Sequence, residues 1–197
     1  MPTAAAVAVA IITMISLISC QSTGGTGQTV HGPKETTTVG TAIIGGPVRG
    51  KTAVIGGLSG ALAGGAIGNY LERQDRDRTA AAIAVGYLPE QGELLKLETV
   101  EALPTTTRRG DIVNLTSTYT VLTPNNRPLT IRETREIRHN GSLVANPFID
   151  VQRSNGTFTS ILPIMLPANA KPGTYEVTTT VSKDQRTSRS MTNFTVQ

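Results

Sequence analysis

Residues 45-GGPVRGKT-52 have the spacing of a phosphate-binding loop, in which glycines, a lysine and a hydroxyl hold the phosphates of a nucleotide. The matching positions are Gly45, Gly50, Lys51 and Thr52. That chemistry also requires a buried strand before the loop, a helix after it and a Mg²⁺-binding acidic residue on a second strand. Here a brief apolar run precedes the loop and a glycine-rich segment follows it. We therefore expect no nucleotide binding, and we predict no cofactor.

The sequence offers no other set of catalytic or metal-binding residues. The two histidines, His31 and His139, are isolated, and the chain has one cysteine, whereas a usual zinc site needs at least three protein ligands. No GxSxG motif is present. Acidic residues mostly neighbour arginines, as in 132-RETREIR-138, which is typical of a solvated surface. We expect no metal site and no enzyme, and the scattered arginines do not form the basic stripe of a nucleic-acid-binding protein.

The single cysteine, Cys20, ends an uncharged and almost wholly apolar run, residues 4–19, which is typical of the core of a secretory signal. The stretch 17-LISC-20 resembles the lipobox of bacterial lipoproteins. That resemblance implies a signal peptide over residues 1–19 and lipidation of Cys20. An uncleaved anchor with an inert cysteine is the alternative, and both interpretations place the protein outside the cytoplasm.

The residues after the cysteine are polar and rich in glycine and threonine. Such a composition is typical of a flexible linker. We therefore predict a lipidated flexible linker over residues 20–38. Gln21 is not the aspartate that retains lipoproteins in the inner membrane, which favours the outer membrane of a Gram-negative cell.

A glycine-rich segment follows, in which four glycines are spaced by four residues and no charge occurs over residues 52–71. As a helix, these residues would be about 30 Å long, near the thickness of the hydrocarbon layer. A glycine stripe on one face lets a second helix approach closely in lipid. We predict a membrane helix, extended over residues 72–88, with these helix-packing residues: Gly56, Gly60, Gly64 and Gly68. A glycine- and alanine-rich loop is the alternative.

The run 51-KTAVIGGLSGALAGGAIGNYLERQDRD-77 resembles the glycine-zipper, two-transmembrane-segment domain of bacterial outer-membrane lipoproteins and surface antigens. The resemblance covers about residues 39–78 and implies a membrane segment and helical extension over residues 39–88. It also implies an envelope protein without catalytic activity, whose partners are membrane lipid and further copies of itself or other envelope proteins. Residues 36–48 are short for a crossing and contain Pro47, so their place relative to the bilayer stays open.

The C-terminal half has the period-two alternation of half-buried strands. In 112-IVNLTSTYTVL-122 and 174-TYEVTTTVS-182, apolar and polar residues alternate, and turn signals such as 139-HNG-141 separate further candidate strands. This pattern predicts an antiparallel sandwich of about seven strands over residues 91–197. The stretch 172-PGTYEVTTTV-181, followed by a short final strand ending 194-FTV-196, resembles the last two strands of bacterial immunoglobulin-like domains.

The expected fold class is therefore α+β in several parts, with a glycine-zipper helical segment before an immunoglobulin-like β-sandwich. The leading hypothesis is a non-enzymatic lipoprotein of the outer membrane, with the sandwich in the periplasm or at the cell surface. Its role would be structural, in envelope integrity through zipper packing. The alternative is an adhesion or assembly module whose sandwich captures a protein partner, and a third hypothesis is an oligomeric pore.

Overall fold

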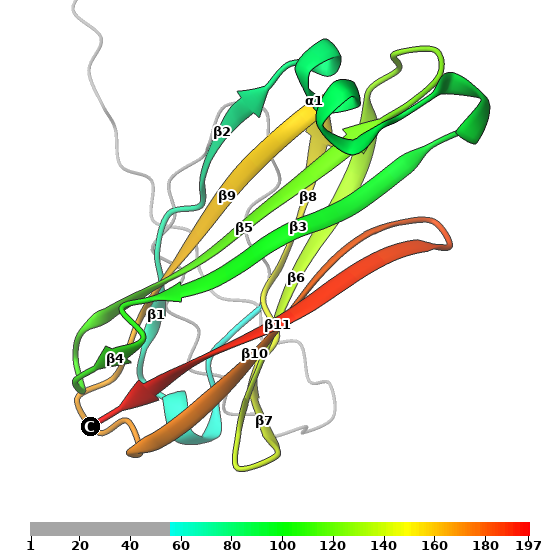
Figure 1. The fold of residues 1–197 in the computed structure, drawn as a ribbon. Coiled ribbons are helices and arrows are strands. Elements are labelled where there is room, and N and C mark those ends of the chain that lie inside the picture. Colours follow the sequence, from blue (N-terminus) through cyan, green and yellow to red (C-terminus); the bar gives the residue numbers. More distant parts are fainter. Residues whose placement is uncertain (1–55) are drawn as a thin grey trace, which may run out of the picture. The chain divides into compact units, whose positions relative to one another are not determined.

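The computed structural model describes residues 56–197, which fold into two facing β-sheets (Figure 1). The five-stranded sheet contains β1 (Ala66–Ile67), β2 (Leu71–Arg76), β3 (Leu94–Leu103), β5 (Ile112–Leu122) and β9 (Gly156–Met165). The six-stranded sheet contains β4 (Thr106–Thr107), β6 (Leu129–His139), β7 (Ser142–Ala145), β8 (Phe148–Arg153), β10 (Gly173–Lys183) and β11 (Arg186–Val196). The other regular elements are the short 3₁₀ turns η1 (Gly60–Leu62) and η2 (Pro89–Gln91) and the helix α1 (Arg78–Val85).

The strand order is β1-β9-β5-β3 in the first sheet, with β2 also paired to β9. In the second sheet it is β4-β11-β10-β6-β7, with β8 also paired to β6. Every one of these pairings is antiparallel except the short one between β4 and β11. The predicted antiparallel sandwich is therefore confirmed, with more strands than the expected seven because several short strands join its edges.

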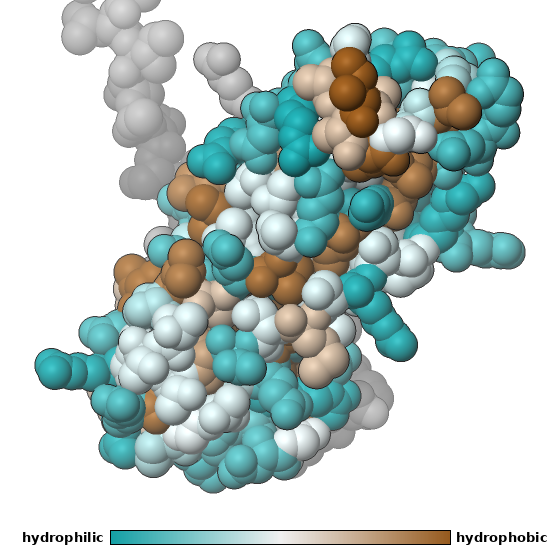
Figure 2. Space-filling view, in the orientation of Figure 1, coloured by the Kyte–Doolittle hydropathy of each residue, from teal (hydrophilic) through white to brown (hydrophobic). Residues whose placement is uncertain are grey.

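The core lies between the sheets, at the positions that the period-two patterns indicate. On β5, the side chains of Val113, Leu115, Tyr119 and Val121 are buried. At the start of the strand, Ile112, Asn114 and Thr116 alternate with them and face outward. Burying an aliphatic or aromatic side chain of this kind stabilises a fold by about 1.5 to 3 kcal/mol. The visible outer surface is correspondingly mostly polar or neutral (Figure 2).

The glycine-rich segment differs from the prediction. In the structure, Gly56, Gly60 and Gly64 have φ values of 130°, 53° and 90°, outside the helical range. From Gly56 to Arg76 the chain instead runs along the edge of the sandwich, and we call residues 56–76 the edge segment. The predicted helix with its glycine stripe is therefore wrong for these residues. None of the helices within residues 56–197 has the length and hydropathy that a membrane crossing requires.

Backbone pairing and apolar burial explain why the edge segment is extended. Leu58 forms an isolated bridge with Ala145 of the six-stranded sheet, and β1 and β2 then pair with β9 of the five-stranded sheet. The side chains of Leu58, Leu62 and Ile67 are buried in the core. The edge of β9 satisfies backbone groups that a helix would satisfy within itself. The sandwich thus begins in the edge segment rather than at residue 91.

Close approach to other backbone explains two of the glycines in this segment. A Cβ atom at Gly65 would lie 2.5 Å from the Met165 carbonyl oxygen and 2.8 Å from Leu58 Cδ1. A Cβ atom at Gly56 would lie 2.7 Å from Pro147 Cα. These glycines therefore let the edge segment lie against the sandwich.

Downstream of the glycines, the predicted helical extension is shorter than residues 72–88. Residues Leu71–Arg76, polar after the first, form β2, and the helix α1 begins after Asp77, whose carboxylate accepts a hydrogen bond from Ala80 N at 2.8 Å. Gly86 ends the helix with φ of 64°. After η2, residues Leu94–Leu103 form strand β3. The predictions for residues 1–19, 20–38 and 39–55, including lipidation of Cys20, lie outside the described residues.

Gly65→Ala tests the packing of the edge segment. The added methyl group meets backbone that cannot move freely, so we expect a loss of about 1 to 3 kcal/mol in the free energy of unfolding. Chemical denaturation measures this loss. The control is Ala63→Ser, an exposed position two residues away, which should stay within about 0.5 kcal/mol of wild type. Equal stabilities for the two variants would contradict the close approach.

Candidate functional site: two polar surfaces of strand β6

Strand β6 carries polar residues on both of its faces, and this arrangement was missed in the sequence. The run 132-RETREIR-138 resembles a solvated surface, but Glu133 and Arg135 are 0% and 1% exposed. Both residues have the same parity as Ile131 and Ile137, which are also buried. Continuing the period of two from the isoleucines would have placed this acid and this arginine inside.

The Glu133 carboxylate lies between the sheets and accepts hydrogen bonds at both oxygens. Oε2 accepts from Arg135 Nη1 at 3.0 Å and from Ser160 Oγ at 2.7 Å. Oε1 accepts from Tyr70 Oη at 2.7 Å and from the hydroxyl of Tyr119. Burial alone would raise the pKa of Glu133, but the nearby arginines and the hydroxyl donors outweigh it and lower this pKa to about 2. The carboxylate is therefore charged at neutral pH.

Arg153, on β8, also contacts this carboxylate. We call Glu72, Tyr70, Tyr119, Glu133, Arg135 and Arg153 the charge cluster. Arg153 Nη2 donates to Tyr70 Oη at 2.7 Å and to Glu133 Oε1 at 3.1 Å, and its Nε donates to Tyr119 Oη at 2.6 Å. Its Nη1 forms an ion pair with Glu72. Burial and then the Glu133 charge raise the pKa of Tyr70, so its hydroxyl stays protonated and can donate.

The charge cluster is electrically balanced, with two arginines and two glutamates, and it spans both sheets. The Arg135 guanidinium also donates to Ser117 Oγ and Ser160 Oγ, each at 2.7 Å, and so ties β6 to β5 and β9. The edge segment supplies Tyr70 and Glu72. Since a buried charge is tolerated only when it is paired, the cluster fixes the register between the sheets and holds the edge segment in place.

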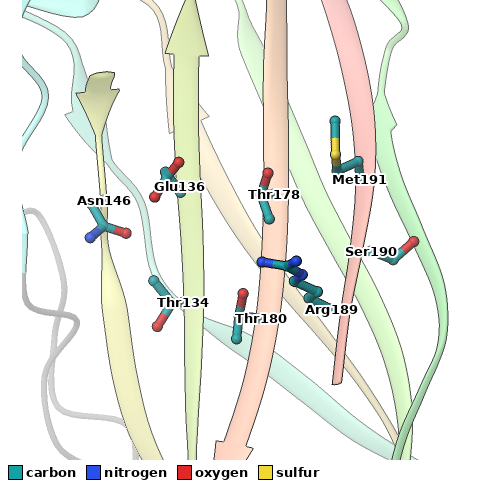
Figure 3. Close-up of a pocket in the computed structure, with 8 residues that line it drawn as sticks. All are labelled: Thr134, Glu136, Asn146, Thr178, Thr180, Arg189, Ser190 and Met191. Carbon is teal, nitrogen blue, oxygen red and sulfur yellow. The ribbon is translucent and has the colours of Figure 1, made fainter. Parts of the chain in front are cut away.

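The opposite face of β6 forms the floor of an open hollow of about 650 Å³, which we call the polar hollow (Figure 3). Direct cross-strand partners arrange six outward side chains in two rows across β6, β10 and β11. The first row is Thr134, Thr180 and Arg189, and the second is Glu136, Thr178 and Met191. Asn146 and Ser190 complete the lining.

The side chains of the polar hollow can form hydrogen bonds with the backbone of a peptide. Threonine hydroxyls and an asparagine amide both donate and accept hydrogen bonds, as the peptide groups of a ligand do. Arg189 offers an exposed positive charge, and Glu136 at the diagonally opposite corner is paired with Arg138 at 2.6 Å. Met191 is 66% exposed and adds one apolar contact. No cluster of potential metal ligands occurs among residues 56–197.

The residues expected to carry function lie elsewhere. Gly56 lies beside Pro147, and Gly68 lies beside Pro163, whose carbonyl oxygen accepts from Gly68 N at 2.8 Å. The four glycines are therefore spread along the edge segment and form no common stripe. His139 is buried against Tyr175, with ring centroids 4.5 Å apart, and makes a structural contact. Cys20 and His31 lie outside the described residues.

Comparisons with known proteins give only distant structural likeness. No protein-family model and no curated protein matches this sequence. Among solved structures, the chain is similar to the Pseudomonas fluorescens alkylpurine DNA glycosylase AlkC bound to DNA, with 18% identity and a TM-score of 0.42 over 54% of this chain and 31% of that chain. It is also similar to a CARDB domain from Pyrococcus furiosus in complex with di-metal ions, with 14% identity and a TM-score of 0.40 over 56% of this chain and 94% of that chain.

A third similar structure is a β-glucosidase from Erythrobacter marinus, with 15% identity and a TM-score of 0.37. That match covers 53% of this chain and 16% of the glucosidase. The chain thus spans less than a third of the glycosylase and a smaller share of the glucosidase. We draw no functional argument from these three similarities.

The charge cluster predicts a strong contrast between two glutamates three residues apart. Glu133→Gln removes a buried charge and leaves two arginines under-compensated, so we expect a loss of about 3 to 5 kcal/mol in the free energy of unfolding. Glu136→Gln changes a surface ion pair and should cost less than about 1 kcal/mol. Denaturant unfolding at neutral pH measures both. Similar losses for the two variants would contradict the buried cluster.

Proposed function

We propose that this protein is a non-enzymatic lipoprotein of the bacterial cell envelope whose β-sandwich, of immunoglobulin-like type, captures a protein partner. Lipid on Cys20 tethers the chain to the outer membrane, and the sandwich lies in the periplasm or at the cell surface. The partner is a protein rather than a nucleic acid, and binding needs no cofactor.

One observation carries this choice between the envelope hypotheses. The edge segment contains all four glycines of the expected zipper, yet it contributes strands β1 and β2 and the buried side chains of Tyr70 and Ile67 to the sandwich. A stabilising role through glycine-zipper helices would require this segment to leave the fold. Capture of a partner requires only an accessible surface, which the sandwich has.

The polar hollow is the surface that suits this role best. Its two rows of side chains cross three adjacent strands, so an extended peptide lying along the first row would meet the hydroxyls of Thr134 and Thr180 and then Arg189. The exposed Arg189 favours an acidic side chain at one end of such a peptide. The charge cluster lies on the other face of β6 and anchors this strand through the hydrogen bonds of Glu133, which would limit the entropy lost on binding.

The sequence supports the tether. The stretch 17-LISC-20 resembles a lipobox, and residues 21–38 have the composition of a flexible linker. Gln21 favours the outer membrane. A linker of this composition lets the sandwich search for its partner near the membrane.

A single experiment in a Gram-negative host tests tether and capture separately. The full chain carries a photoreactive phenylalanine at Asn146, an exposed residue on the rim of the hollow. We expect labelled fatty acid on the wild type, an outer-membrane location and one discrete cross-linked protein. Cys20→Ser should lose the label and the location.

Thr178→Lys, which fills the polar hollow, should remove most of the cross-linked product while leaving the lipid label unchanged. The matched control is Thr116→Lys, a half-buried threonine on the outer face of the other sheet. A product that survives Thr178→Lys would overturn capture at the hollow. A wild type that carries no lipid and stays in the inner membrane would overturn the tether.

A further inference from the structure

Exposed apolar side chains gather at one end of the outer face of the five-stranded sheet. Ile112 and Met165 are direct cross-strand partners on β5 and β9 and are 48% and 44% exposed. Leu103, at the end of β3, is 48% exposed and pairs with Asn114, next to Ile112 on the same face. We call Leu103, Ile112 and Met165 the apolar ledge. Figure 2 shows brown atoms gathered over the neighbouring ends of β1, β5 and β9.

A small apolar hollow of about 170 Å³ opens beside the ledge. The edge segment forms one wall of this hollow and the ends of β5 and β9 form the other. Its lining is apolar except for one asparagine: Ala66, Ile67, Gly68, Asn69, Ile112, Pro163 and Met165. The ledge is therefore continuous with a recess that can hold a few methylene groups. Contiguous apolar surface that stays exposed to water marks interaction sites in many proteins.

A basic loop adjoins the ledge. The connection from Leu103 to Ile112 carries Arg108 and Arg109, which are both exposed. The one acid in this connection, Asp111, has its carboxylate turned into the loop, where it accepts from Arg108 N at 3.0 Å and from Thr107 Oγ1 at 3.3 Å. Lys171, exposed on the neighbouring connection before β10, adds a further positive charge at this end of the sandwich.

Apolar side chains beside paired arginines match the chemistry of an anionic bilayer surface. Such a surface presents phosphate groups above hydrocarbon, so Arg108 and Arg109 would meet headgroups while Leu103 and Ile112 enter the boundary below them. A second copy of the chain fits less well, because a two-fold contact through the ledge would bring like-charged loops together. One acidic residue, Glu101, lies on this outer face near the ledge, two residues before Leu103 on β3, so the two arginines of the loop outnumber it.

We propose that the apolar ledge and its basic loop dock the sandwich on an anionic lipid surface. The proposal builds on the tether at Cys20, which would hold the sandwich near the membrane, but the docking surface itself consists of residues 103–112 and 165. Docking by this end leaves the polar hollow, which lies on the outer face of the other sheet, open to a partner.

The experiment measures which part of the full chain contacts lipid. The purified protein is reconstituted with vesicles of phosphatidylcholine alone or with added phosphatidylglycerol. An environment-sensitive dye is attached to Ile112→Cys or to the matched control Ile83→Cys, on α1, which is 78% exposed. Both are made in chains whose Cys20 is lipidated or replaced by serine. Nitroxide lipids then quench dyes that reach the boundary of the bilayer.

We expect strong quenching at position 112 and little at position 83 with phosphatidylglycerol, and loss of most of the quenching when Arg108→Glu and Arg109→Glu are combined. A dye at Leu103→Cys provides a second probe if Ile112→Cys does not fold. Equal quenching at positions 112 and 83, or none at 112, would overturn the proposal. So would cross-linking of two copies through the ledge in place of quenching. If the tether fails instead, Cys20 carries no lipid, yet the dye at position 112 is still quenched by anionic vesicles.

Discussion

The carboxylate of Glu133 places a negative charge between two β-sheets, away from solvent. A charge in that position is stable only with close counter-charges and hydrogen-bond donors, and the chain gathers them from four strands, β5, β6, β8 and β9, and from the edge segment. Arg135 comes from the same strand, Arg153 from β8 and Tyr70 from the edge segment. The need to compensate one carboxylate therefore ties the two sheets to each other, and ties the edge segment to both sheets.

This constraint also connects the interior with the surface. Because side chains alternate along β6, Glu133 and Arg135 of the charge cluster are each followed by a residue of the polar hollow. Glu133 and Arg135 hold the strand from inside, and Thr134 and Glu136 are presented outside in fixed positions. For the proposed capture of a partner, side chains held in place would lose little entropy on binding.

Part of this structure could be predicted from the sequence. The alternation on β5 and β10 gives the buried faces correctly, whereas the helix expected over residues 72–88 begins only after Asp77. The glycine spacing was misleading, because glycine is equally useful where backbone approaches backbone in a sheet, and Gly65 shows this use. Spacing alone cannot distinguish a helix face from an extended edge whose partner strand, β9, is about ninety residues away. The interior role of Glu133 was likewise hidden by its arginine neighbours.

The most direct test of this account is a double-mutant cycle between the edge segment and the core. Tyr70→Phe and Glu133→Gln are combined in the full chain, and the free energy of unfolding is measured for each single variant and for the pair. A hydroxyl that donates to this carboxylate predicts a coupling energy of about 0.5 to 3 kcal/mol. Strictly additive effects would mean that Tyr70 does not contact Glu133, and the charge cluster would then not hold the edge segment in the sandwich.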